Sequence, residues 1–324
     1  MSETLTVEPR RAFHTLFDAP LVLDLDTLRE TGAHVAILGL PFGAPYSMED
    51  VNNDQANAPT AIRRAWQRAL RGLERYDFDI GGPLLDGRDI KVVDCGDVPG
   101  DQLDMDKHVR LSEEAVRKIV SAGCMIISLG GDHAVPIPVF RGLTSVPDLE
   151  GPVTLIQVDA HIDWREEVNG VREGLSSTIR RASEMDHIGE IFQIGLRSAG
   201  SARPEEVEAA QAYGANLITD MELQSQGMEA ILERIPDGGT YYLTVDADGI
   251  DPTIAPAVAG PAPGGVTYPQ MRTLIHGLVG KGRVLGMDVV EITPARDVNA
   301  ITSITAVRLI CNLIGKAVRA DYFS

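Results

Sequence analysis

Carboxylates and imidazoles recur in short motifs that directly follow apolar runs. The stretch VDAHID carries Asp159, His161 and Asp163 on alternate positions. Alternate residues of an extended chain point the same way, so these side chains can share one face. The stretch LTVDADGIDP repeats this spacing with Asp246 and Asp248. Imidazole and carboxylate together suit Mn, Fe, Ni or Zn better than Ca or Mg, so the motifs indicate a transition-metal site.

A third motif, SLGGDHA, places Asp132 and His133 after an apolar run and a Gly-Gly turn. A single Asp at a strand end is usually a turn former or a helix cap. The three motifs together favour chemistry, because converging carboxylates repel one another unless cations compensate them. Four aspartates balance two divalent ions, and a bridging carboxylate can hold two ions ~3.5–4 Å apart, as in two-metal hydrolases.

Apolar runs supply the strands that must position these motifs. They lie at 34–40, 90–96, 124–130, 153–160, 191–196, 241–247 and 283–292. Several are continuously apolar, which is typical of parallel strands covered on both faces. Helical patterns alternate with them at 58–76, 105–123, 204–214 and 301–320. The alternation predicts one doubly wound α/β domain with a mostly parallel sheet.

Three long loops, 41–59, 163–177 and 251–269, each follow a predicted strand. Loops of this length in a compact domain are usually functional. Open α/β sheets bind ligands outside the carboxyl ends of their strands. We therefore expect the three loops and the three motifs to meet at that edge.

Composition excludes some partners. The 324 residues carry a net charge of −18, which argues against nucleic acid and is compatible with a cationic substrate. Cys95, Cys124 and Cys311 lack CxxC spacing, which indicates reduced, buried thiols in a cytoplasmic protein. No signal peptide is recognisable and no stretch reaches the ~20 apolar residues of a membrane span, so we expect no membrane partner.

Four segments carry a family resemblance. SLGGDH, VDAHID, LTVDADGIDP and GMDVVEITP resemble, in order and approximate spacing, the motifs of the ureohydrolase superfamily, which includes arginase and agmatinase. The resemblance runs from about residue 34 to the C-terminus, which leaves about 1–30 as an N-terminal extension of a single domain. It implies a three-layer α/β sandwich. It also implies one ion held by His133, Asp159, Asp163 and Asp246, and a second held by Asp159, His161, Asp246 and Asp248.

The resemblance further implies a mechanism. A hydroxide between two ions, with Mn expected and Ni as the alternative, attacks the central guanidinium carbon. Asp163 orients that hydroxide, and Glu291 of DVVEITP pairs with the guanidinium, a directional match between a planar cation and a carboxylate. The intermediate then collapses to urea and an amine. The metal-dependent amidinohydrolase reaction is the activity that the resemblance predicts.

The chain departs from the family pattern in its substrate pocket. Leu175 stands where arginase and agmatinase carry a loop histidine credited with proton transfer, which leucine cannot perform. Val258, Ala259 and Gly260 replace a Thr-Gly-Thr pattern and remove two hydroxyls from the expected pocket wall. Trp164 follows the last ligand of VDAHID, where it either packs in the core or stacks on a flat cation. The metal ligands are complete, so the changes affect the substrate rather than the chemistry.

Agmatine is the substrate that the nearest subgroup suggests. A guanidino acid, free guanidine or a biguanide such as dimethylbiguanide is the rival, hydrolysed in the same way. The missing loop histidine also leaves open a weakly active or non-catalytic subunit of a hetero-oligomer with a paralogue, and a deacetylase on the same fold is a third possibility. The family's usual assembly implies a homo-oligomer, a trimer or a hexamer.

Overall fold

The structure is a computed structural model, and it describes residues 14–47, 54–100, 104–199 and 202–323. The strands of these ranges form one parallel sheet in the order β2-β1-β3-β8-β7-β4-β5-β6. Their bounds are β1 Val35–Leu40, β2 Val92–Asp97, β3 Met125–Gly130, β4 Val153–Val158, β5 Ile188–Leu196, β6 Asn216–Thr219, β7 Thr240–Asp246 and β8 Arg283–Val290. The parallel sheet confirms the prediction made from the continuously apolar runs.

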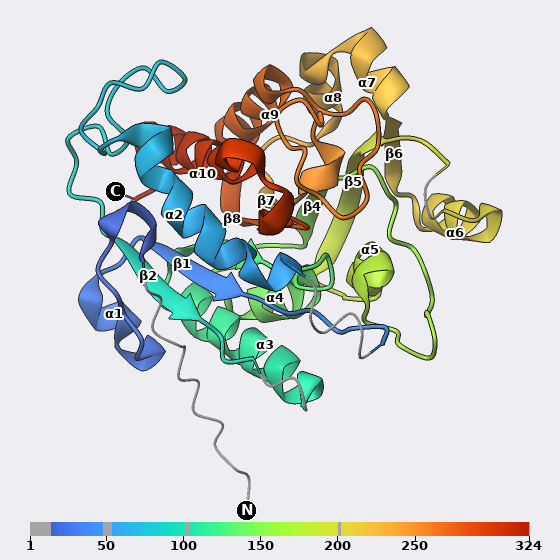
Figure 1. The fold of residues 1–324 in the computed structure, drawn as a ribbon, viewed down its shortest axis with the longest axis horizontal. Helices are drawn as coiled ribbons and strands as arrows, with labels where there is room; N and C mark the ends of the chain where they lie inside the picture. Colours follow the sequence, from blue (N-terminus) through green and yellow to red (C-terminus); the bar gives the residue numbers. More distant parts are fainter. Residues whose placement is uncertain (1–13, 48–53, 101–103, 200–201, 324) are drawn as a thin grey trace, which may run out of the picture.

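Helices cover both faces of the sheet (Figure 1). The helices are α1 Leu28–Thr31, α2 Ala58–Leu70, α3 Met105–Ser121, α4 Pro136–Gly142, α5 Thr178–Ala182, α6 Pro204–Tyr213, α7 Asp220–Gln226, α8 Met228–Arg234, α9 Tyr268–Lys281 and α10 Ile301–Arg319. One hydrophobic core lies between the sheet and α2, α9 and α10, and a second lies under α3 and α4. This is the expected three-layer α/β sandwich.

The observed elements differ from the sequence predictions in the end of one helix and in two elements that were not predicted. Helix α2 ends at Leu70 rather than residue 76, because Arg71 adopts a left-handed backbone with φ 60° and stops the helix. Strand β6 and helix α9 were not predicted from the sequence. β6 has only four residues at the sheet edge, and its alternation is too short to be recognised.

Helix α10 has an unusually apolar sequence for a helix of this length. With its preceding turn it spans Val298–Arg319 and passes the length and hydropathy test for a membrane span, contrary to the sequence expectation. However, 67% of the tested window is buried inside the protein. Fourteen of its residues are buried, and Val307, Ile310 and Ile314 belong to the core that it shares with α2 and α9. The helix is therefore explained as a core helix of the sandwich.

The three cysteines are buried and unpaired, as expected for structural thiols. Burial raises the pKa of Cys124 to about 11, so that thiol stays protonated. Residues 1–13 of the proposed N-terminal extension, about 1–30, lie outside the described part of the chain. Within 14–30, Leu16 and Leu28 are fully buried, so at least this part packs onto the domain.

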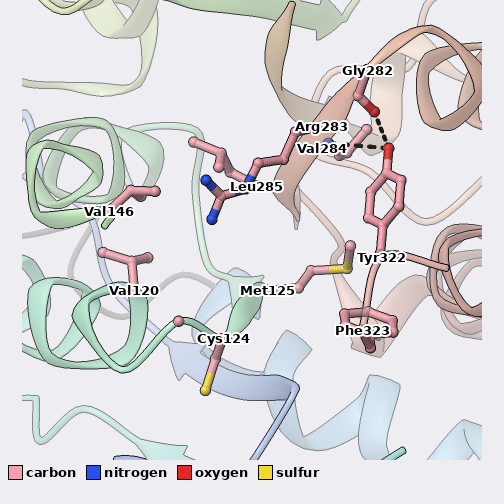
Figure 2. A pocket seen from close by; sticks show the side chains of 11 residues that line it. Val120, Cys124, Met125, Val146, Gly282, Arg283, Val284, Leu285, Tyr322 and Phe323 are labelled. Carbon is pink, nitrogen blue, oxygen red and sulfur yellow. Dashed lines mark hydrogen bonds between the residues drawn. The ribbon is translucent and has the colours of Figure 1, made fainter. Parts of the chain in front are cut away.

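The amino edge of the sheet contains a cavity of about 240 Å³ (Figure 2). The starts of β3 and β8, the end of α3 and the C-terminal residues Tyr322 and Phe323 enclose it. The Tyr322 hydroxyl closes one side with hydrogen bonds that link it to Gly282 and Val284. Its wall is formed largely by apolar side chains, and it holds no group of histidines and carboxylates.

Candidate metal centre

Four neighbouring strands bring the chemical motifs to one place. Strands β3, β8, β7 and β4 lie side by side in the sheet. His133 follows β3, Asp159 and His161 follow β4, Asp246 ends β7, and Glu291 follows β8. Because the strands are parallel, these residues meet at the carboxyl edge, where the sequence analysis placed them.

The first ligand group surrounds the ring of His133. Its Nδ1 lies 2.9 Å from an Asp159 oxygen, 2.9 Å from an Asp163 oxygen and 3.0 Å from an Asp246 oxygen. Among the described residues this buried nitrogen has no partner with hydrogen-bond geometry. Donor atoms that bind one ion at 2.0–2.2 Å lie about 3 Å apart at right angles, so the arrangement fits a shared cation. These four side chains are the set that the resemblance implied for one ion.

The second group shares Asp159 with the first. His161 Nδ1 lies 3.4 Å from the other Asp159 oxygen and 3.3 Å from an Asp248 oxygen. Backbone amides hold the carboxylates in place: His161 N donates to Asp159 at 2.6 Å, and Asp248 N donates to Asp246 at 2.7 Å. Asp159 thus faces both groups, as a bridging ligand must. The implied bridging by Asp246 stays a prediction, because its geometry places it with the first group.

Burial sets the electrostatics of the centre. It raises the pKa of Asp246 and of Asp248 above the usual value, and it raises the pKa of Asp163 to about 6, with the Asp159 charge adding to the effect. Burial also acts on Asp159, but His133 and His161 lower the pKa of that carboxyl below its usual value. Four ionised carboxylates are therefore unfavourable here without added positive charge. The donor set fits two divalent cations, whose four charges match the four aspartates.

A polar row crosses the sheet directly beneath the centre. Ser128, Asp288, Thr244, Gln157 and Gln193 lie opposite one another in register on β3, β8, β7, β4 and β5, and all five are fully buried. Such residues on parallel strands point to the same face. Gln157 Nε2 donates to Asp159 at 2.6 Å, and Thr244 donates to Asp288 at 2.7 Å and contacts the His133 ring at 3.3 Å. The row therefore orients ligands of the first group.

Trp164 contacts the polar row beneath the metal ligands and does not line the substrate pocket. Its side chain is 2% exposed and lies in the core beneath α4 and α5. Its indole N–H donates to Gln193 at 2.7 Å, and its ring packs against Tyr213 at 5.7 Å. The proposed stacking on a flat cation is wrong, because Asp163 turns the chain with a left-handed φ of 50° and the next side chain points inward.

Glu291 occupies a constrained position beside the first group. Its backbone has a left-handed φ of 64°, and its N–H donates to Gly131 O at 2.8 Å. The His133 backbone N–H donates to its Oε1 at 2.8 Å. Burial raises the pKa of Glu291 to about 7, and the neighbouring Asp132 charge contributes. Non-glycine residues in this backbone region are rare and cluster at functional sites.

The three long loops form the walls of one cavity at this edge, with a volume of about 310 Å³. Five ligand residues and Glu291 form its floor: His133, His161, Asp163, Asp246 and Asp248. The loops add Gln55 from 41–59, Leu175 and Ser176 from 163–177, and Ala259 and Gly260 from 251–269. Val258, also predicted to line the pocket, is instead 2% exposed in the core, because its bridge to Ile292 turns its side chain away.

Two residues near the cavity were missed by the sequence analysis. Gln55 donates from Nε2 to Glu291 Oε2 at 3.0 Å. The Tyr46 hydroxyl accepts from the Ser176 backbone N–H at 2.8 Å and so ties the first loop to the second. Both lie in the long polar loop 41–59, whose length indicated function but whose individual residues carried no motif.

Comparison with known proteins identifies the fold family. The family model described as "Arginase family" matches residues 33–315. The guanidinobutyrase of Pseudomonas aeruginosa is 31% identical over 244 residues, which cover 74% of each chain. The agmatinase of Bacillus anthracis is 30% identical and covers 75% of this chain and 80% of its own. The solved structure of the proclavaminate amidino hydrolase from Streptomyces clavuligerus superposes with a TM-score of 0.81 at 25% identity, covering 96% of this chain and 98% of that one.

Proposed function

The chain belongs to the arginase family of metal-dependent amidinohydrolases, and we propose that it cleaves a guanidino-type C–N bond to release urea and an amine. The observation that carries the proposal is the convergence of three carboxylate oxygens on His133 Nδ1 within 3.0 Å. Glu291 lines the same cavity and offers a carboxylate to a planar cation. Mn is the expected metal and Ni the alternative.

The chain's own residues have distinct tasks in this reaction. Two divalent ions, when bound, act as Lewis acids and supply a nucleophile from water near neutral pH. Glu291 holds the guanidinium so that its central carbon faces the ligand groups. Asp163 has one oxygen in the first group and can accept a proton from the attacking water and pass it on. The leaving amine takes up a proton, and urea is the second product.

The cavity lining favours a substrate without a carboxylate. Among the described residues that line it there is no lysine or arginine, and the charged groups are acidic apart from two histidines. A guanidino acid would bring its own carboxylate into a cavity whose described lining offers no lysine or arginine to pair with it. Agmatine, whose tail ends in an amine, has no such conflict. The likeness to a guanidinobutyrase keeps guanidino acids in the test as the alternative.

Leu175 lines the cavity at the position where the family pattern has a histidine. The side chain makes that wall apolar, which suits a short or alkylated guanidine, including a biguanide. The leaving nitrogen then takes up its proton from water or from Asp163, which has accepted one from the attacking water. The rival reading, a weakly active partner subunit, gains support only from this one residue, since the ligand groups are complete.

A urea-release screen tests the proposal. Purified protein is reconstituted separately with Mn and Ni and assayed on agmatine, guanidinobutyrate, guanidinopropionate, guanidine and dimethylbiguanide. Urea is measured for each substrate, and guanylurea and dimethylamine are also measured for dimethylbiguanide. Acetate release from an acetylated amine is the control for a deacetylase. We expect urea release, largest with a substrate that lacks a carboxylate, and about two ions per chain by elemental analysis. Asp246→Ala is the matched control, which should lose both activity and metal. Full urea release by Asp246→Ala, or acetate as the product, would refute the proposal.

Assembly and location form part of the same proposal. We expect a homo-oligomer, a trimer or hexamer, in the cytoplasm, with the hetero-oligomer as the alternative. Light scattering of the purified chain gives its mass in solution. If activity appears only when a paralogous chain is co-expressed and co-purifies, the hetero-oligomer is the correct assembly.

A further inference from the structure

Gln55 lies in the wall of the carboxyl-edge cavity next to Glu291. It belongs to the short 3-10 helix Asp54–Asn57 that leads into α2, and it is 6% exposed. Long polar side chains are rarely buried this deeply unless their groups are used. One of its groups is used on Glu291, through the hydrogen bond of 3.0 Å.

The segment that carries Gln55 is fixed to the segment that follows Glu291. Asp54 accepts a hydrogen bond from the Ala295 backbone N–H at 2.5 Å. Asn57 donates to the other Asp54 oxygen at 3.1 Å, which closes the short helix on itself. Asp54 and Asn57, at the two ends of this segment, therefore fix the position of Gln55 relative to Glu291.

The Glu291 carboxylate keeps half of its hydrogen-bonding capacity. Two oxygens offer about four acceptor positions. The His133 backbone N–H takes one position on Oε1, and Gln55 takes one on Oε2. Counting the described residues only, one position on each oxygen remains, which is the arrangement a two-pronged guanidinium or amidine requires.

The carboxamide of Gln55 also carries an oxygen acceptor, which the hydrogen bond to Glu291 does not use. An amide that donates through its nitrogen keeps an oxygen acceptor on the same carbon. This acceptor is neutral, so it adds recognition without placing another negative charge beside Glu291 and Asp132, whose charges already oppose each other. An aliphatic residue would supply no acceptor here, and a carboxylate would add repulsion.

We infer that Gln55 is a specificity-determining residue, whose amide oxygen accepts an N–H of the planar cation that Glu291 binds. The inference rests on the proposed function, since it concerns the substrate of the same site. The pair then recognises a cation with N–H groups on more than one nitrogen. Alkylation of the nitrogens that face the pair removes a hydrogen bond to Gln55 as well as to Glu291.

A cycle of two protein forms and two substrates tests the inference. Wild type and Gln55→Met are compared on agmatine and on its analogue with one methyl group on each terminal guanidino nitrogen. Both reactions are followed by release of their common product, butane-1,4-diamine, because the analogue yields dimethylurea in place of urea. The ratio of the two kcat/KM values measures discrimination. If the Gln55 amide oxygen accepts a substrate N–H, the ratio of kcat/KM for agmatine to kcat/KM for the methylated analogue falls at least fivefold in Gln55→Met relative to wild type. If Gln55 only supports Glu291, both substrates lose activity equally and the ratio stays within twofold, which overturns the inference.

Two further measurements keep the cycle decisive. Gln55→Ala is the second variant in case Gln55→Met folds poorly, and metal content and thermal midpoint report whether each variant is intact. Leu175→Ala, which lines the same cavity from another loop, should change both kcat/KM values and keep their ratio. If the screen selects a biguanide, biguanide and its dimethyl form replace the agmatine pair. A wild-type protein that releases urea from no guanidine overturns the proposed function, and the inference with it.

Discussion

The two edges of the sheet contain cavities of comparable size but opposite chemistry. The amino-edge cavity measures about 240 Å³ and the carboxyl-edge cavity about 310 Å³. The first is enclosed largely by apolar side chains such as Val120, Val146 and Leu285. The second is lined by five of the six ligand residues and by Glu291. Volume therefore does not locate the active site in this fold, whereas buried groups that cannot all be ionised together do.

The contrast follows from the direction of the strands. Every described strand runs the same way, so all strand ends that carry loops such as 163–177 and 251–269 lie on one side. At the other edge the helices return to the sheet through short connections, for example Ser121 to Met125 between α3 and β3. The long loops bring polar side chains to the carboxyl edge, whereas the short helix-to-strand connections leave mainly apolar side chains packed at the amino edge.

The largest effect is expected from Glu291→Gln. Glutamine keeps the shape but removes the negative charge that pairs with a guanidinium, so kcat/KM should fall about 100-fold, in line with about 2–3 kcal/mol for a charge-assisted contact. Metal content should remain at two ions per chain, because Glu291 lies outside both ligand groups. Steady-state urea release and elemental analysis measure the two quantities. Loss of metal in this variant would show that Glu291 supports the ligands rather than the substrate.

A smaller effect is expected from Gln157→Leu in the polar row. The change removes the hydrogen bond of 2.6 Å to Asp159, and loss of such a partner typically lowers metal affinity about 10–100-fold. Competition with a chelator measures the affinity. Thr154→Val is the matched control on the same strand, nearer the amino edge, and should leave affinity unchanged. Equal losses in the two variants would mean that the strand as a whole, and not the row, holds the centre.

The metal-free protein should lose stability as the pH rises. Burial raises the folded-state pKa of Asp163 from 3.8 to about 6 and that of Glu291 from 4.5 to about 7. The folded state then binds more protons than the unfolded state, so the free energy of unfolding declines as the pH rises from about 4 to 7. The thermal midpoint after chelation should fall by several degrees between pH 5 and 7.5. With bound metal the trend should reverse, because protons compete with the ions; a flat profile in both forms would contradict the charge balance described for the centre.

Leu285→Ala at the amino edge should not affect catalysis. Leu285 is 4% exposed and lines the apolar cavity, so its truncation should lower the free energy of unfolding by about 2–4 kcal/mol. Chemical denaturation measures the loss. The kcat/KM should stay within twofold of wild type. A tenfold loss of activity would show that strand β8 couples the two edges.

The sequence predicted the parts of the site that depend on spacing along one strand. Asp159, His161 and Asp163 are separated by single residues, and the end of a strand is enough to aim them at one edge. The wall of the cavity depends on distant segments and was predicted less well. Gln55 meets Glu291 across the fold, next to the hydrogen bond between Ala295 and Asp54, and no local pattern carries that information.

The direction of individual side chains was also predicted less well from the sequence. Trp164 and Val258 neighbour site residues in the sequence, and proximity suggested that they line the pocket. The left-handed backbone at Asp163 and the bridge between Val258 and Ile292 turn both side chains into the core. Backbone turns of this kind in non-glycine residues depend on tertiary contacts, so the sequence alone does not reveal them.

The strand order also fixes when the centre can exist during synthesis. Strand β8, near the C-terminal end, lies between β3 and β7 in the sheet. Until it has left the ribosome, the His133 side of the site has no neighbour that links it to Asp246. A site absent from the unfinished chain binds ions weakly at best. The two ligand groups can therefore come together only after the chain has been synthesised through β8.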